Sequence, residues 1–267
     1  MCRWAAYIGA PSFLSDLVTA PEHSLIVQSR QAEECKTTLN ADGFGLAWYD
    51  QRPEPGLYRD TGPAWSDPNL RSLAEQLRAK IFLAHVRAAT GSATSRNNCH
   101  PFTSGAWSFM HNGQVGGFDR LRKRADMLIP DALYGDRRGA TDSEALFLIA
   151  LGAGLRDAPA LGLARAAALL EAEAQRIGAR PALRMTAALS DGRSLYAVRY
   201  ASDNRAPSLY YRRTKGGAGW QVTSEPLEAS GHWTEVPPST FCTFTANDVA
   251  LQPFQLPKST QAQVFEP

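Results

Sequence analysis

Residues 142–177 read DSEALFLIALGAGLRDAPALGLARAAALLEAEAQRI, and they interrupt a chain that otherwise consists of short β-type runs. Within this stretch, Ser143–Leu155 and Leu161–Ile177 are rich in Ala, Leu and Glu and carry apolar residues on a 3.6-residue period. That period predicts two long helices, and Gly178 suits the C-terminal cap of the second one. Because strands precede and follow this helical block, the sequence indicates an α+β domain with helices packed on sheet faces.

The predicted strands are short β-type runs bounded by Gly, Pro or Asp. Two pairs of neighbouring strands should form hairpins, because a Gly-containing turn joins the strands of each pair, at 190–193 and at 215–217. One further helix is predicted from Pro68 to Leu77, where the apolar residues share one face. The predicted strands are Trp4–Ile8, Gly45–Tyr49, Ile81–Arg87, Ala106–Met110, Arg184–Leu189, Ser194–Tyr200, Ser208–Arg212, Gly219–Thr223 and Thr240–Thr245.

Length and composition indicate one globular domain covering residues 1–267, with a Pro-rich C-terminal tail at 246–267. The chain is 44% hydrophobic and 20% charged, and its formal charge of +2 comes without a long basic run, so nucleic acid is not an expected partner. No apolar stretch reaches the length of a membrane span, and nothing apolar precedes Cys2. We therefore expect no membrane segment, no secretion signal and a cytoplasmic location.

The cysteines and histidines do not form a recognisable metal or disulfide pattern. Four cysteines are scattered without a CxxC motif, and the five histidines do not fall at ligand spacing beside them. We expect neither disulfides nor a metal site, and no cofactor. The cysteines are Cys2, Cys35, Cys99 and Cys242.

Cys2 follows the initiator methionine directly. A methionine before a small residue is normally removed, which would leave a cysteine with a free α-amine at the start of the chain. Such a residue combines an attacking thiol with its own base, because an α-amine titrates near ~7.7–8. The alternative interpretation is a cysteine that packs as a small hydrophobic residue.

Three further segments carry groups that could serve such a nucleophile. Arg87 ends a predicted buried strand and, with Thr90 in the following turn, could bind a carboxylate; alternatively, the arginine reaches solvent. His111-Asn112-Gly113 ends another predicted strand, and an Asn-Gly turn there would offer an amide side chain and a backbone N–H to an oxyanion. The alternative is an ordinary turn.

The third segment, Thr141-Asp142-Ser143-Glu144, begins the first long helix. Asp142 could hold a substrate ammonium group, or Thr141 or Asp142 could cap the helix, with Glu144 completing a capping box from Thr141. A thiol with its own base, oxyanion donors, an arginine and an aspartate together describe a site for a γ-glutamyl compound. Such a compound has an α-carboxylate and an α-ammonium at one end and an amide carbonyl at the other.

These motifs resemble the class II glutamine amidotransferases of the N-terminal-nucleophile (Ntn) hydrolase superfamily, from Cys2 to about Pro226. Finer features are similar to stand-alone members, among them the glutathione-degrading amidotransferase subunit of yeast and the ergothioneine-pathway γ-glutamyl hydrolase. Those features are Met1-Cys2-Arg3, Pro21–Leu25, Asn40–Gly45, Gly62–Trp65, Asn98–Phe102 and Ser224–Pro226.

The resemblance implies a four-layer αββα sandwich and a role for each matching residue. Cys2 would be the nucleophile, and Asn112 with the Gly113 N–H would form the oxyanion hole. Arg87 and Thr90 would bind the α-carboxylate, Asp142 the α-ammonium, and His111 would belong to the substrate-binding set. Ala88-Ala89 stand where many relatives have an aromatic residue, which implies a differently shaped pocket rim.

The resemblance implies an amidohydrolase that cleaves a γ-glutamyl amide bond through a γ-glutamyl thioester on Cys2. Its substrate would be glutamine, a γ-glutamyl peptide or a thiol metabolite. Two alternatives stay open: a glutaminase subunit that delivers ammonia to a separate synthase, and a non-catalytic γ-glutamyl-binding regulatory module. The expected partner is a small-molecule γ-glutamyl substrate, together with a possible partner subunit or a second copy of the chain.

Overall fold

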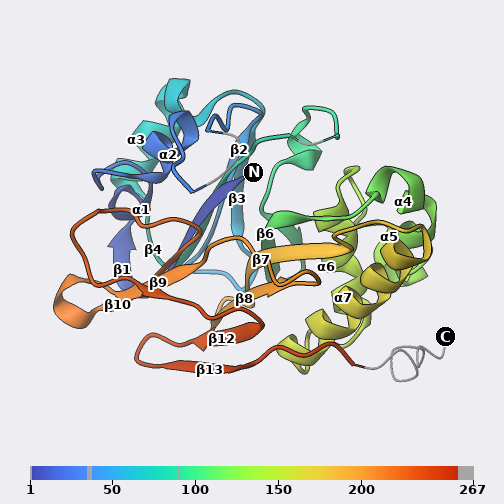
Figure 1. Ribbon diagram of the computed structural model, residues 1–267. Coiled ribbons are helices and arrows are strands. Elements are labelled where there is room, and N and C mark those ends of the chain that lie inside the picture. Colours follow the sequence, from blue (N-terminus) through green and yellow to red (C-terminus); the bar gives the residue numbers. More distant parts are fainter. Residues whose placement is uncertain (1, 35–37, 90, 258–267) are drawn as a thin grey trace.

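The computed structural model describes residues 2–34, 38–89 and 91–257, which form two antiparallel sheets with helices on the outer face of each (Figure 1). The strands are β1 Arg3–Phe13, β2 Phe44–Tyr49, β3 Gly56–Asp60, β4 Arg78–Val86, β5 Phe102–Ser104, β6 Trp107–Val115, β7 Leu183–Ser190, β8 Leu195–Ala201, β9 Tyr210–Arg213, β10 Gly219–Thr223, β11 Thr234–Glu235, β12 Thr240–Phe244 and β13 Val249–Pro253. The helices are α1 Ser15–Val18, α2 Leu25–Arg30, α3 Pro68–Gln76, α4 Phe118–Asp126, α5 Asp131–Tyr134, α6 Asp142–Gly152 and α7 Pro159–Arg176. Short 3-10 turns lie at Ala64–Ser66, Arg96–Asn98 and Lys215–Gly217.

Each sheet is built from antiparallel neighbours. The seven-stranded sheet has the order β11-β9-β10-β1-β4-β2-β3, and the six-stranded sheet has the order β13-β12-β8-β7-β6-β5. In the first sheet, β1 lies between two partners: Ala5 pairs with Thr223 of β10 on one side and with Ala84 of β4 on the other. This central position fixes the register of β1 from both sides, and Cys2 directly precedes this strand.

Strand alternation divides the interior into three apolar layers. On β1, Trp4, Ala6 and Ile8 belong to the core between the two sheets. Ala5 and Tyr7 point to the opposite face, where α1, α2 and α3 cover the sheet. The outer face of the six-stranded sheet is covered by the helices that follow β6, with α6 and α7 contributing most of the core there. The result is the expected four-layer αββα sandwich (Figure 1).

The two long predicted helices are confirmed as α6 and α7; the second ends at Arg176, and Gly178 terminates it with a positive φ of 73°. Thr141 caps α6 by accepting the Glu144 N–H at 3.2 Å. The reciprocal half of the capping box is absent in the described residues, because the Glu144 carboxylate instead accepts hydrogen bonds from Arg137 and from the Gly139 N–H. The predicted hairpins are confirmed as β7-β8 and β9-β10. In the part of the chain that the structure describes, no helix combines the length and apolarity that a membrane crossing needs.

One prediction about where a strand ends is wrong. Asn112-Gly113 is not a turn: β6 runs on to Val115, because Asn112 and Gly113 pair with Thr186 and Met185 of β7. This pairing comes from a strand about seventy residues away, so local turn propensity does not decide the conformation. The Pro-rich segment at 246–267 includes one further strand, because Val249–Pro253 forms β13 against β12.

Truncation of Phe147 tests the packing of α6 on the six-stranded sheet. Its fully buried ring stacks on Phe109 of β6 with 5.3 Å between ring centroids. We expect F147A to lower the free energy of unfolding by about 3–5 kcal/mol, measured by urea denaturation. The control L161A removes a side chain that is 44% exposed on α7 and should change stability by less than about 0.5 kcal/mol. Equal effects of the two variants would contradict this packing.

Candidate active site

The Cys2 thiol lies where β1 begins. Side chains two residues apart on an extended chain point to the same side, and Trp4 lies in the core between the sheets. The Cys2 side chain, two residues before Trp4, therefore belongs to that layer. The Ala88 N–H donates to Sγ at 3.5 Å, and Sγ lies 3.6 Å from the Ala88 carbonyl oxygen. Burial raises the pKa of the thiol, while the Ala88 N–H and the charge of Arg87 oppose that rise. The thiol therefore needs a base before it can attack a substrate at neutral pH.

Arg87 follows β4 directly, and its side chain is only 2% exposed. One terminal nitrogen donates to the Asp42 carbonyl oxygen at 3.1 Å, and the other donates to Ser92 Oγ at 2.7 Å. The alternative of an arginine that reaches solvent is therefore wrong. Thr90, its predicted companion, lies outside the described residues.

Asp42 holds the segment that contacts the thiol, and it is not among the site residues predicted from the sequence. Its N–H donates to the Arg87 carbonyl oxygen at 3.0 Å, and its carboxylate accepts the Ala89 N–H at 2.7 Å. The next residue, Gly43, has a φ of 111° and would place a Cβ 2.5 Å from Cys99 Sγ. Asp42 and Gly43 thus fix the backbone on both sides of Ala88.

Asn112 lies on β6 with the same parity as Met110, so its side chain also belongs to the layer between the sheets. Its carboxamide is 1% exposed, and neither polar atom has a hydrogen-bond partner within the described residues. A buried amide without partners costs free energy that a bound substrate oxygen can recover. This side chain is therefore a ready donor toward the layer that contains Cys2.

The Gly113 N–H points to the edge of β6 that faces away from β7. The Gly116 N–H donates to the Ala182 carbonyl oxygen on the β7 side, whereas the Val115 N–H donates to Asp142. Because successive N–H groups along a strand point to opposite sides, Gly113 shares the direction of Val115. Strand β5 pairs with β6 only as far as Phe109, so this edge has no strand partner near Gly113 in the described chain.

Asp142, the first residue of α6, borders that same edge. Its carboxylate accepts the Val115 N–H at 2.8 Å and the Ser143 N–H at 2.8 Å, and the residue is partly exposed. Capping of the helix is done by Thr141, so Asp142 is free of that role. Its charge acts on the Cys2 thiol, whose pKa it raises, while the charge of Arg87 lowers it. The site thus carries one positive and one negative group beside the thiol.

His111 lies behind this site rather than in it, which corrects its predicted place among the substrate-binding residues. His111 directly precedes Asn112 on β6, so its ring points to the opposite face of the sheet, which the helices cover. There Nδ1 lies 2.9 Å from Ser143 Oγ, and Nε2 lies 3.3 Å from the Arg184 carbonyl oxygen. Burial lowers the pKa of His111, so the ring is neutral at pH 7. Since a carbonyl oxygen only accepts, Nε2 carries the proton and Ser143 donates to Nδ1.

Two further histidines, His85 and His100, form a buried stack with 4.1 Å between ring centroids. His85 has the same parity on β4 as Leu83, which belongs to the core between the sheets. Burial lowers the pKa of His85 to about 3 and that of His100 well below its usual value, so both rings are neutral. Their motifs were noted in the sequence, but no role was assigned to either ring.

A buried ion-pair cluster holds β1 immediately after Cys2. Arg3 Nε lies 2.9 Å from the Glu225 carboxylate, which also contacts His23 at 2.7 Å and accepts the Glu33 N–H at 2.7 Å. His23, Glu33 and Glu225 place potential metal ligands within 4.8 Å of one another. Because the guanidinium and two other donors already satisfy Glu225, this cluster fits an ion-pair anchor better than a cation site.

The family model of the class II glutamine amidotransferases matches residues 15–216. The chain belongs to this family. It is 31% identical to a probable glutamine amidotransferase of Saccharomyces cerevisiae, over 95% of this chain and 84% of the yeast protein. It is also 36% identical to a γ-glutamyl-hercynylcysteine sulfoxide hydrolase of Mycolicibacterium smegmatis, over 54% of this chain and 68% of that protein.

Solved structures show the same fold. A glutamine aminotransferase class-II domain protein from Silicibacter pomeroyi is 46% identical, with a TM-score of 0.77 over 95% of this chain and 100% of that one. A glutamine phosphoribosylpyrophosphate amidotransferase from B. subtilis shares the fold at 14% identity, with a TM-score of 0.65 over 96% of this chain and 50% of that one.

The anchor behind Cys2 makes stability depend on pH. The hydrogen bond that the His23 ring donates to the Glu225 carboxylate raises the pKa of His23. A group whose pKa is higher in the folded than in the unfolded state contributes its full stabilisation of the fold at pH values below its unfolded-state pKa. That contribution is lost as the pH rises through the folded-state pKa. We expect the free energy of unfolding to fall as the pH rises above about 6.5, and H23Q to lack that part of the fall, measured by urea titration.

The other shifted histidines do not enter this pH window. The lowered pKa values of His85, His100 and His111 remove stability only as the pH falls below about 6.5. An identical slope in wild type and H23Q would show that the contact between His23 and Glu225 contributes nothing.

Proposed function

We propose that this protein hydrolyses the γ-amide bond of a γ-glutamyl compound, with Cys2 as its N-terminal nucleophile. The observation that carries the proposal is the Asn112 carboxamide, which is buried without a partner in the described chain and lies in the same layer as the Cys2 thiol. Together with the outward-facing Gly113 N–H, it offers two donors to a developing oxyanion.

The proposed reaction has two stages. Once Met1 is removed, the Cys2 α-amine takes the thiol proton and sulfur attacks the γ-carbonyl carbon. The tetrahedral oxyanion accepts hydrogen bonds from Asn112 and Gly113. The C–N bond then breaks, and the leaving amine takes a proton from the α-ammonium group of Cys2. Water attacks the resulting thioester, releases glutamate and restores the thiol.

The charged groups beside the thiol fit the amino-acid end of the substrate. Arg87 is fixed by Asp42 and Ser92 and keeps further N–H donors for an α-carboxylate. Asp142 is partly exposed and can accept an α-ammonium. The Ala88-Ala89 segment adds only small side chains at this point, so its bulk does not restrict the leaving group.

Removal of the Asn112 carboxamide tests the oxyanion hole. We expect N112A to lower kcat for glutamate release by about 10²–10³-fold, with the far-UV circular dichroism spectrum unchanged. The control N69A removes an exposed carboxamide at the start of α3 and should keep wild-type kcat. Wild-type kcat in folded N112A would contradict the assignment.

A panel of γ-glutamyl compounds identifies the leaving group. Glutamine, glutathione, γ-glutamylcysteine and a γ-glutamyl sulfoxide would be assayed for glutamate release by wild type and C2A. Relatives are named as a glutamine amidotransferase and as a γ-glutamyl sulfoxide hydrolase, so the panel spans both. We expect release from at least one γ-glutamyl peptide or sulfoxide, and none by C2A. Activity on glutamine alone would favour a subunit that delivers ammonia to a synthase.

A further inference from the structure

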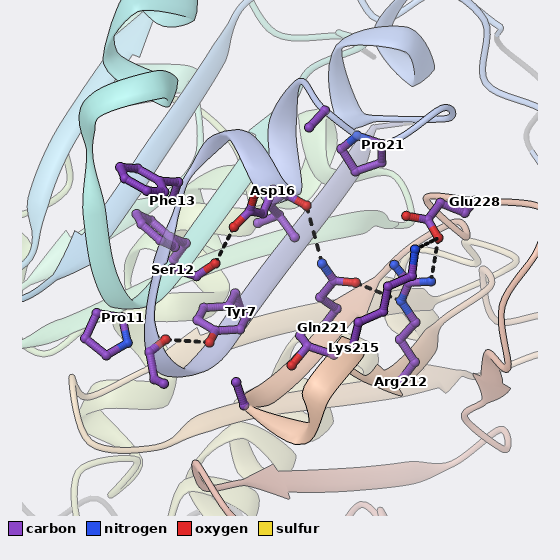
Figure 2. Close-up of a pocket in the computed structure, with 16 residues that line it drawn as sticks. Tyr7, Pro11, Ser12, Phe13, Asp16, Pro21, Arg212, Lys215, Gln221 and Glu228 are labelled. Carbon is purple, nitrogen blue, oxygen red and sulfur yellow. Dashed lines mark hydrogen bonds and ion pairs between the residues drawn. The ribbon is translucent and has the colours of Figure 1, made fainter.

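A cavity of about 400 Å³ lies on the outer face of the seven-stranded sheet, on the side opposite to the Cys2 layer (Figure 2). It is bordered by the second half of β1, by α1 and by the β9-β10 hairpin. None of Cys2, Arg87, Asn112 and Asp142 lines it. The cavity is therefore separate from the candidate active site.

Two glycines beside the cavity make room for one of its lining side chains, Tyr7. Gly9 of β1 pairs with Gly219 of β10, and a Cβ on Gly9 would lie 2.6 Å from the Tyr7 hydroxyl. A Cβ on Gly219 would lie 2.9 Å from the Tyr7 ring. The glycine pair thus lets the Tyr7 ring lie against the sheet, where its hydroxyl donates to the Ala10 carbonyl oxygen at 2.5 Å (Figure 2).

A bulge in β1 opens the cavity at its other end. Ile8 pairs with Ile81 and Ser12 with Ala79, so β1 advances four residues while β4 advances two. Bulges of this kind redirect side chains and are frequent beside functional sites. Here the bulge directs Ser12 toward α1, where its hydroxyl donates to the Asp16 carboxylate at 2.5 Å.

The α1 side of the cavity carries a negative charge, and the side formed by the β9-β10 hairpin carries positive charges (Figure 2). Asp16 on α1 makes no ion pair within the described residues. On the hairpin side, Arg212 and Lys215 share one acid, Glu228, at 3.1 Å and 3.9 Å, which leaves a positive charge in excess. Gln221 lies between the walls and accepts from Arg212 Nε at 2.8 Å.

We propose that this cavity binds a zwitterionic ligand of amino-acid or dipeptide size that carries an apolar side chain. The ligand's ammonium group lies against Asp16, and its carboxylate lies against Lys215 and Arg212. Its apolar side chain packs against Leu17 and Pro21. The volume falls in the range of about 300–1,000 Å³ that small-molecule sites occupy.

Calorimetric titration with the dipeptide alanylphenylalanine tests the proposal. We expect saturable binding, and we expect both D16N and N-acetylation of the dipeptide to raise Kd about tenfold or more, because each removes a charge-assisted contact. The control D50N changes an exposed carboxylate outside the cavity and should leave Kd unchanged. N-acetylation tests the same contact on the wild-type protein, so the result does not depend on the folding of D16N.

Amide chemical shifts locate the bound dipeptide, because the candidate active site also carries an acid and an arginine. Shifts at the lining residues Ala10, Asp16 and Ala218 are expected on titration. Absence of saturable binding, shifts confined to residues around Cys2, or equal Kd values for the free and N-acetylated dipeptide would each overturn the proposal.

Discussion

The candidate site depends on one constraint: side chains alternate between the two faces of the sheet along β1 and along β6. Cys2 and Asn112 share the layer between the sheets because each has the parity of an inward residue, Trp4 on β1 and Met110 on β6. Their neighbours point to the opposite faces for the same reason. A slip of one residue in either strand would exchange these faces and remove the Cys2 thiol or the Asn112 carboxamide from the candidate site.

Arg3 and His111, the neighbours of Cys2 and Asn112 that face away from this layer, make polar contacts that help to keep the two strands in register. Arg3 pairs with Glu225 behind β1, and His111 contacts Ser143 behind β6. A buried charge that lost its partner would be strongly destabilising, so the Arg3 pair penalises a shifted register more than it adds to total stability. The layer between the sheets is thus positioned by polar contacts that lie on its far sides.

Much of this architecture follows from local patterns in the sequence. The 3.6-residue period placed α6 and α7, and the Gly-containing turns placed two hairpins. Non-local pairing accounts for the main errors: Asn112-Gly113 has strong turn propensity, yet β7 holds it in a strand. Asp42 was missed because its partners, Arg87 and Ala89, lie more than forty residues along the chain. The position of His111 behind the site follows from alternation once β6 is known to continue past Asn112.

The claim that Cys2 carries the γ-glutamyl group is tested most directly by mass spectrometry of the acid-quenched enzyme. Protein mixed with an excess of its best γ-glutamyl substrate would be quenched during turnover and digested, and the N-terminal peptide would be analysed. We expect a peptide that begins at Cys2, lacks Met1 and carries one γ-glutamyl group in thioester linkage. Full turnover by a protein that retains Met1, or a γ-glutamyl group attached to any other residue, would contradict it.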